Sequence, residues 1–226
     1  MPALTLRQAL SVRPGVTAII GGGGKSTLLL QLGLELARSA RVILCTTTHI
    51  YPPEGVACLQ NPSEAELSAV LRAEGCVCVG TPCENGKLRA PELPVGRLAA
   101  LADYVLAEAD GAKGRPLKAH AAHEPVVPPQ ADQTILVLGL SGLGRPISEA
   151  AHRPELYSAR LGVTEDALVT PELAAELLCL EALHTRVLLN QADTAARRQA
   201  ARALAARLSC PVCMAALQKG WIECLS

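Results

Sequence analysis

The chain has 226 residues, 50% of them hydrophobic and 19% charged, and its 21 basic and 21 acidic side chains give a formal net charge of zero. This composition is typical of a globular protein and excludes a disordered chain. The balanced charge argues against a non-specific nucleic-acid binder, and one Trp, three Tyr and no Phe argue against a base-stacking platform. We therefore expect no nucleic-acid partner.

Strands and helices alternate along the chain. Aliphatic runs bounded by turn residues predict strands at 16–20, 41–45, 76–80, 104–107, 134–138, 186–189 and 211–215. Leu- and Ala-rich segments predict helices at 28–38, 63–74, 171–180 and 194–208, and 84–87 reads as a hairpin turn. This order predicts an α/β fold, with a mostly parallel sheet flanked by helices on both faces in a three-layer sandwich. We expect one domain over 1–226, with a loop or lid around 112–130.

No uncharged apolar run reaches the roughly 18 residues that span a bilayer, and no basic flank precedes an apolar run near the start. We expect no membrane association and a cytoplasmic location. The nine cysteines include a C-x-x-C pair, Cys210 and Cys213, and a pair within a strand pattern, Cys76 and Cys78. This spacing matches a zinc site poorly. Core thiols are therefore the preferred interpretation, and a metal or redox role is the alternative.

A glycine-rich loop joins the first expected strand to the first expected helix, the context that a phosphate-binding loop requires. Glycines let backbone N–H groups approach phosphate oxygens, and a helix N-terminus favours an anion. In this interpretation Lys25 bridges the β- and γ-phosphates and Ser26 binds Mg²⁺. The loop is shorter than the usual motif, because Ile19 replaces its first glycine. The expected cradle is Gly21, Gly22, Gly23, Gly24, Lys25, Ser26 and Thr27.

An acidic pair follows the expected strand at 104–107. Glu108 and Asp110 alternate along the chain, so they lie on one side of the strand. We expect Asp110 to hold Mg²⁺, directly or through water, and Glu108 to orient water, so that both acids act in catalysis with Lys25. The alternative is a strand end with solvated acids.

The sequence Asn190-Gln191-Ala192-Asp193 follows another expected strand and resembles the N-K-x-D guanine-recognition motif. An Asp carboxylate accepts hydrogen bonds from two guanine donors that adenine lacks, so GTP is favoured over ATP. Gln191 replaces the usual Lys, which leaves the base preference open. The alternative is a turn in which Asp193 or Thr194 caps the next helix.

A basic segment follows the acidic pair, and we expect Lys113 and Lys118 in it to contact phosphates or an anionic substrate. Thr48, at the end of the second expected strand, is a further ligand candidate. The alternatives are a solvated basic loop and an ordinary strand end.

These motifs together resemble the YqeC family, the accessory proteins of selenium-dependent molybdenum hydroxylases. The matching segments are 21–27, 46–52, 108–113, 116–118, 123–128 and 190–193. The resemblance implies a P-loop NTPase-like fold and a role in maturing such a hydroxylase or its cofactor. The implied partners are a nucleoside triphosphate and a molybdenum hydroxylase or cofactor-maturation protein.

Three functions share this phosphate cradle. The first is an accessory protein that binds GTP or ATP with Mg²⁺ and hydrolyses it. The second is a small-molecule kinase whose substrate contacts the segments 46–49 and 113–118. The third is a non-enzymatic carrier of a nucleotide-bearing molybdopterin cofactor. The sequence leaves the choice among them open, together with the oligomeric state.

Overall fold

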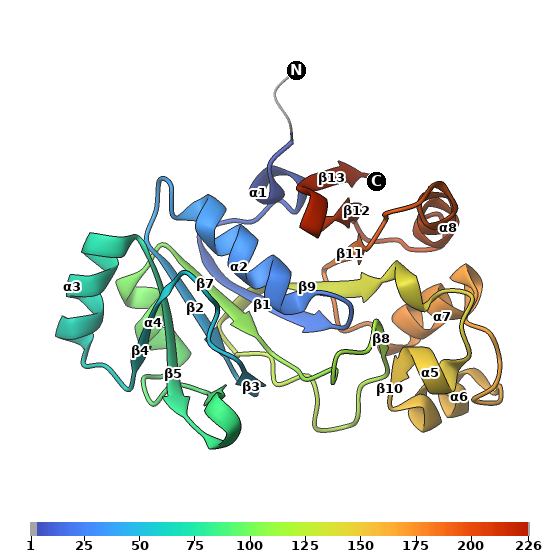
Figure 1. The fold of residues 1–226 in the computed structure, drawn as a ribbon, viewed down its shortest axis with the longest axis horizontal. Coiled ribbons are helices and arrows are strands. Elements are labelled where there is room, and N and C mark those ends of the chain that lie inside the picture. Colours follow the sequence, from blue (N-terminus) through green and yellow to red (C-terminus); the bar gives the residue numbers. More distant parts are fainter. Residues whose placement is uncertain (1–3, 226) are drawn as a thin grey trace.

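The computed structural model describes residues 4–225, and one large sheet forms its centre (Figure 1). The strands of this sheet are β1 (Gly15–Gly21), β2 (Val42–Thr46), β3 (His49–Ile50), β4 (Ala57–Gln60), β5 (Cys76–Pro82), β6 (Leu88–Arg89), β7 (Tyr104–Glu108), β9 (Ala131–Gly139), β11 (Arg186–Asn190), β12 (Val212–Ala216) and β13 (Trp221–Cys224). Their order is β13-β12-β11-β9-β1-β7-β2-β5-β6-β3, and β4 also pairs with β5.

The sheet is parallel from β12 through β5, as the alternating sequence predicts. Two antiparallel additions flank it: β13 pairs with β12 at one end, and β6 pairs with β5 and β3 at the other. The strand that precedes the glycine-rich loop, β1, lies directly between β7 and β9. The acidic pair at the end of β7 is therefore next to this loop.

Helices cover both faces of the sheet. The helices are α1 (Leu6–Ala9), α2 (Lys25–Leu36), α3 (Glu64–Glu74), α4 (Val95–Leu101), α5 (Ile147–Ala150), α6 (Pro154–Leu161), α7 (Pro171–Glu181) and α8 (Ala195–Ala205). Apolar residues of α1 and α2 pack on one face, where α2 crosses the sheet (Figure 1). Residues of α3 and α4 pack on part of the other face, and residues of α7 and α8 pack on the rest of it. The predicted α/β sandwich with a mostly parallel sheet is confirmed.

Side-chain alternation along the strands positions the acids. In β7, Leu106 packs in the core beneath α2, whereas Val105 and Ala107 belong to the core on the other face. The same alternation turns Glu108 toward α2. The fold therefore directs this carboxylate to the helix that carries Lys25 and Ser26.

Two segments differ from a simple reading of the sequence. Residues 140–170, for which no element is predicted, contain the short helices α5 and α6. The segment 112–130 is mostly loop, but β8 (Leu117–Lys118) pairs with β10 (Ala151–His152), and residues 116–120 are buried. The inner part of this segment thus belongs to the core and is not a free loop. The expectation of a single domain over 1–226 stays a prediction.

The cysteines are all free thiols, and several lie in the sheet. Burial raises the pKa of Cys45 to about 12 and that of Cys76 to about 11, so both stay protonated at neutral pH. Within residues 4–225, no group of three or more His, Cys, Asp or Glu side chains is placed to hold a metal ion. No helix in this range is long and apolar enough to cross a membrane.

Candidate functional site

The loop between β1 and α2 is closely packed at its glycines. Gly23 and Gly24 have φ of +77° and +128°. A Cβ on Gly23 would lie 2.4 Å from the backbone nitrogen of Gly139, and one on Gly24 would lie 2.3 Å from Asn190 Nδ2. Only glycine fits these two positions, because both the backbone angle and the neighbouring atoms exclude a side chain.

The N-terminus of α2 presents donors for an anion. Among the hydrogen bonds of the described residues, none is donated by the backbone N–H groups of Gly24, Lys25, Ser26 and Thr27. The first N–H groups of a helix have no partner within it. They also carry the positive end of the helix dipole. This end of the loop can therefore accept a phosphate group.

Lys25 lies at the centre of the site and is 6% exposed. Its Nζ donates to the carbonyl of Gly21 at 2.8 Å and lies 3.2 Å from Asp110 Oδ1 and 3.6 Å from Glu108 Oε1. The ammonium group is thus paired with two carboxylates. A phosphate that recruits Lys25 has to compete with them.

Glu108 faces the first turn of α2. Its Oε2 accepts a hydrogen bond from Ser26 Oγ at 2.9 Å. Burial raises the pKa of Glu108 and outweighs the opposing effects of Lys25 and Ser26. The hydroxyl and carboxylate oxygens form a pair of hard ligands, which is the donor type that Mg²⁺ prefers.

Asp110 lies behind this pair and is fully buried. Its Oδ2 accepts from the N–H of Gly21 at 2.8 Å and lies 2.8 Å from His120 Nε2 and 3.2 Å from Lys118 Nζ. Burial alone would raise its pKa, but the His120 hydrogen bond and the charges of Lys25 and Lys118 together lower it. Glu108 lines a cleft in front of Lys25, whereas Asp110 does not. The metal-binding role expected for Asp110 stays a prediction.

His120 links Asp110 to Glu181, the last residue of α7. Its Nδ1 lies 2.5 Å from Glu181 Oε2, and Arg160 pairs with the other oxygen of Glu181. Neither His120 nor Glu181 is among the site residues expected from the sequence. No local pattern signals this partner, because Glu181 ends α7 and lies 61 residues away along the chain.

A cleft of about 1230 Å³ opens in front of Lys25, Ser26 and Glu108. Its walls include nine of the expected site residues, together with residues that were not expected there. Lys118 and Asp110 do not line the cleft; Lys118 is instead buried between Asp110 and Glu124. The nine expected residues in its walls are Gly23, Gly24, Lys25, Ser26, Thr27, Thr48, Glu108, Lys113 and Gln191.

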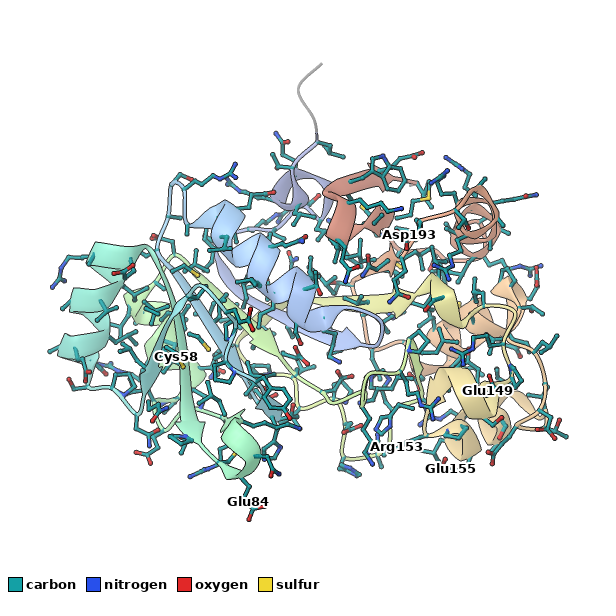
Figure 2. All side chains as sticks on the ribbon, in the orientation of Figure 1. Cys58, Glu84, Glu149, Arg153, Glu155 and Asp193 are labelled. Carbon is teal, nitrogen blue, oxygen red and sulfur yellow. The ribbon has the colours of Figure 1, made fainter. Side chains whose placement is uncertain are left out.

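The predicted base-recognition segment adjoins the loop. Asn190 Nδ2 donates to the carbonyl of Gly23 at 2.8 Å, and its Oδ1 accepts from the N–H of Leu217 at 3.2 Å, so Asn190 braces the loop. Asp193 lines a separate hollow of about 80 Å³ beside Gly23, Gly24 and Thr27. Figure 2 shows Asp193 near β12 and α8, and its carboxylate lies 3.3 Å from Lys219 Nζ.

Contacts around the glycine-rich loop position Gly21, Gly22 and Gln191. Gly21 and Gly22 lie outside the main cleft, on a small cavity with Lys118 and His120. Gln191 accepts from Ser141 Oγ at 2.5 Å, which fixes its side chain beside Gly139. This amide is therefore held beside Gly139. The longer Lys of N-K-x-D is expected to project freely, so the two side chains differ.

The sequence matches known proteins over this same region. A sequence model of the YqeC protein family matches residues 17–155, which include the glycine-rich loop and the acidic pair. The chain belongs to the YqeC family. Its relatives include the "Uncharacterized protein YqeC" of Escherichia coli (strain K12), 32% identical over 177 residues, or 73% of this chain and 68% of the relative. The resemblance to the YqeC family is thus confirmed, and the family match ends before the predicted base-recognition segment at 190–193.

Proposed function

We propose that this protein binds a nucleoside triphosphate with Mg²⁺ at the Gly21–Thr27 loop, hydrolyses it and prefers GTP to ATP. The observation that carries the proposal is a single juxtaposition. Free helix N–H groups, the Lys25 ammonium and the Ser26–Glu108 pair all face one cleft. A phosphate chain needs these three kinds of partner together.

The residues that would hold Mg²⁺ are Ser26 and Glu108. Their oxygens lie 2.9 Å apart in the cleft wall, and both are hard donors. When bound, the ion supplies positive charge that stabilises the charge developing on the phosphates. Lys25 contributes a second positive charge, and the N–H groups of the loop orient the phosphate oxygens. Asp110 acts indirectly, since it positions Lys25 and the backbone of Gly21.

The base preference is assigned to Asp193. Its hollow adjoins the phosphate loop at Gly23, Gly24 and Thr27, so a base there remains within reach of phosphates on the loop. A guanine has to displace Lys219 and Arg197 from the carboxylate, because Lys219 lies at 3.3 Å and Arg197 at 3.5 Å.

The biological role that we propose is that of an accessory protein in the maturation of a selenium-dependent molybdenum hydroxylase or its cofactor. This role rests on the family resemblance. Its test is whether turnover of the nucleotide by the purified protein rises when a molybdenum hydroxylase apoprotein is added, with an unrelated apoprotein as the control.

The proposal is tested by measuring equilibrium binding of GTP, ATP and CTP with Mg²⁺ by calorimetry. We expect GTP to bind most tightly, Lys25→Ala to weaken binding about 10- to 100-fold and Asp193→Ala to abolish the preference among bases. Failure of all three nucleotides to bind the folded wild-type protein contradicts the proposal. Tight binding without release of inorganic phosphate would instead favour a carrier or a kinase.

A further inference from the structure

The cleft is larger than one ligand requires. Small-molecule pockets typically occupy about 300–1,000 Å³, whereas this one measures about 1230 Å³. The phosphate loop lines one part of it. Two segments with no part in the proposed nucleotide site line another part, which we call the far wall. These segments are 49–51, on and after β3, and 83–87, between β5 and β6.

The far wall carries an exposed aromatic ring. Tyr51 is 65% exposed, whereas Tyr104 and Tyr157 are almost fully buried. The Lys87 ammonium lies 5.0 Å from the centre of the Tyr51 ring, within the range of a cation–π contact. One face of the ring is thus engaged by a cation at the cleft wall, which restricts where the ring can move. An exposed ring beside a cation is suited to stack on a planar anionic ligand.

Within residues 4–225, the cations of the cleft include three without an acidic partner. Lys87, Lys113 and Arg115 line the cleft, and no ion pair among the described residues includes any of them. The Arg115 guanidinium donates to the backbone carbonyl of Glu149, which leaves its charge uncompensated.

The acids of the cleft are three, and two of them are already paired. Glu124 pairs with Lys118 and Arg153, and Glu108 pairs with Lys25. Glu84 is exposed and projects from the tip of the segment (Figure 2). Unpaired cations therefore outnumber unpaired acids in the cleft, which attracts an anion.

We infer that the cleft holds a second ligand opposite the phosphate loop: a planar heteroaromatic ring that bears a phosphate, stacked on Tyr51 and neutralised by Lys87 and Lys113. The inference rests on the proposed function, because it assigns the phosphate loop to the nucleotide and leaves the far wall free. It gives the protein two substrates in one cleft. Such an arrangement is the one that a transferase or a nucleotide-gated carrier needs.

The test uses flavin mononucleotide as the probe, since it combines a planar ring with a phosphate and loses fluorescence when the ring stacks on tyrosine. Titration of the full-length protein should quench the probe and give saturable binding. Riboflavin, which lacks the phosphate, should bind at least several-fold more weakly. We expect Tyr51→Ala to weaken probe binding by about tenfold or more, the usual scale for losing an aromatic stacking partner. Tyr51→Phe, which keeps the aromatic ring, should retain probe binding.

Two further variants separate the far wall from the phosphate loop. Lys113→Ala should weaken probe binding, whereas Lys113→Arg, which keeps the charge, should preserve most of it. Lys25→Ala should leave probe binding within about twofold of wild type, and saturating GTP with Mg²⁺ should not displace the probe.

The outcomes separate the two proposals. If Lys25→Ala abolishes probe binding, or GTP competes with the probe, the probe occupies the phosphate loop, which overturns the second site and leaves the nucleotide site intact. Unchanged binding in both Tyr51→Ala and Lys113→Ala, or no binding to wild type, also overturns the inference. If the probe binds in a manner that depends on Tyr51 and Lys113 but the protein binds no nucleotide, the proposed function fails and the second site stands.

Discussion

The Lys25 ammonium lies 3.2 Å from Asp110 Oδ1 and donates to the carbonyl of Gly21 at 2.8 Å, so the lysine expected to meet phosphate is bound to its own loop. The side chains of Lys25 and Asp110 are 5% and 0% exposed, which shields their interaction from solvent. In the function that we propose, nucleotide binding therefore exchanges one set of charged partners for another. The affinity measured for a nucleotide is the difference between the two sets.

The first prediction follows from this exchange. Lys25→Ala should weaken GTP binding about 10- to 100-fold, since a hydrogen bond to a charged group contributes roughly 1.5–3 kcal/mol. It should also lower the melting temperature, because Asp110 and Glu108 lose their shared cation in a buried setting. Calorimetry and thermal unfolding measure the two effects. Arg72→Ala, at an exposed cation on α3 outside both proposed sites, is the matched control for fold. Unchanged GTP affinity in a folded Lys25→Ala protein would contradict the assignment.

The second prediction separates the two acids. Because burial raises the pKa of Glu108, its ionised form is disfavoured in the fold, and Glu108→Gln should leave stability unchanged or slightly increased. This variant should lose the Mg²⁺-dependent part of nucleotide binding. Asp110→Asn should instead destabilise the protein by about 3–5 kcal/mol, since it leaves buried cations without their anion.

The measurement is denaturant unfolding of both variants, with nucleotide titrations in Mg²⁺ and in a chelator. Equal destabilisation by the two substitutions would show that the acids share one structural role. Loss of the Mg²⁺ effect in Asp110→Asn but not in Glu108→Gln would restore Asp110 as the metal-facing acid.

Much of the fold follows from local signals in the chain. The strands at β1, β2, β7 and β11 are short aliphatic runs between turn residues, and parallel strands buried on both faces have this pattern. Ser63 also marks the start of α3, since its side chain accepts from the N–H of Glu66 as serine commonly does at a helix N-cap. The proximity of the glycine loop to the acidic pair is different, because it depends on β7 lying between β1 and β2, and the chain order alone does not give this arrangement.

The roles of the acids could not be read from the sequence. Alternation places Glu108 and Asp110 on the same side of the strand, but β7 ends at Glu108. Beyond that point the environment depends on partners distant in the chain: Lys118, His120 and the N–H of Gly21 surround Asp110. Long-range charge pairing of this kind leaves no spacing rule in the sequence.

The third prediction concerns pH. Burial alone would lower the pKa of His120, but its hydrogen bonds to Asp110 and Glu181 raise it above the ordinary 6.5. A raised folded-state pKa gives stability that is fully present below the unfolded pKa and is lost as the pH rises through the folded pKa. The stability difference between His120 and His120→Gln proteins should therefore be largest below pH 6.5 and should shrink as the pH rises above 6.5.

Thermal unfolding across this pH range measures the difference. Burial lowers the pKa of His184, which would add an opposite pH dependence. Both proteins should therefore carry His184→Asn, so that titration of His184 does not contribute to the measured difference. A difference that grows as the pH rises would contradict the protonated state assigned to His120.

The last prediction concerns the base. Asp193→Asn should reduce the preference for GTP over ATP by about tenfold or more, because the amide replaces one of two acceptors with a donor and removes a charged partner. Asn190→Ala should differ in kind. It removes the link between the carbonyl of Gly23 and the N–H of Leu217, so it should weaken GTP and ATP binding equally. Competition titrations with both nucleotides distinguish these effects. If Asp193→Asn weakens ATP as much as GTP, the hollow beside the loop does not read the base.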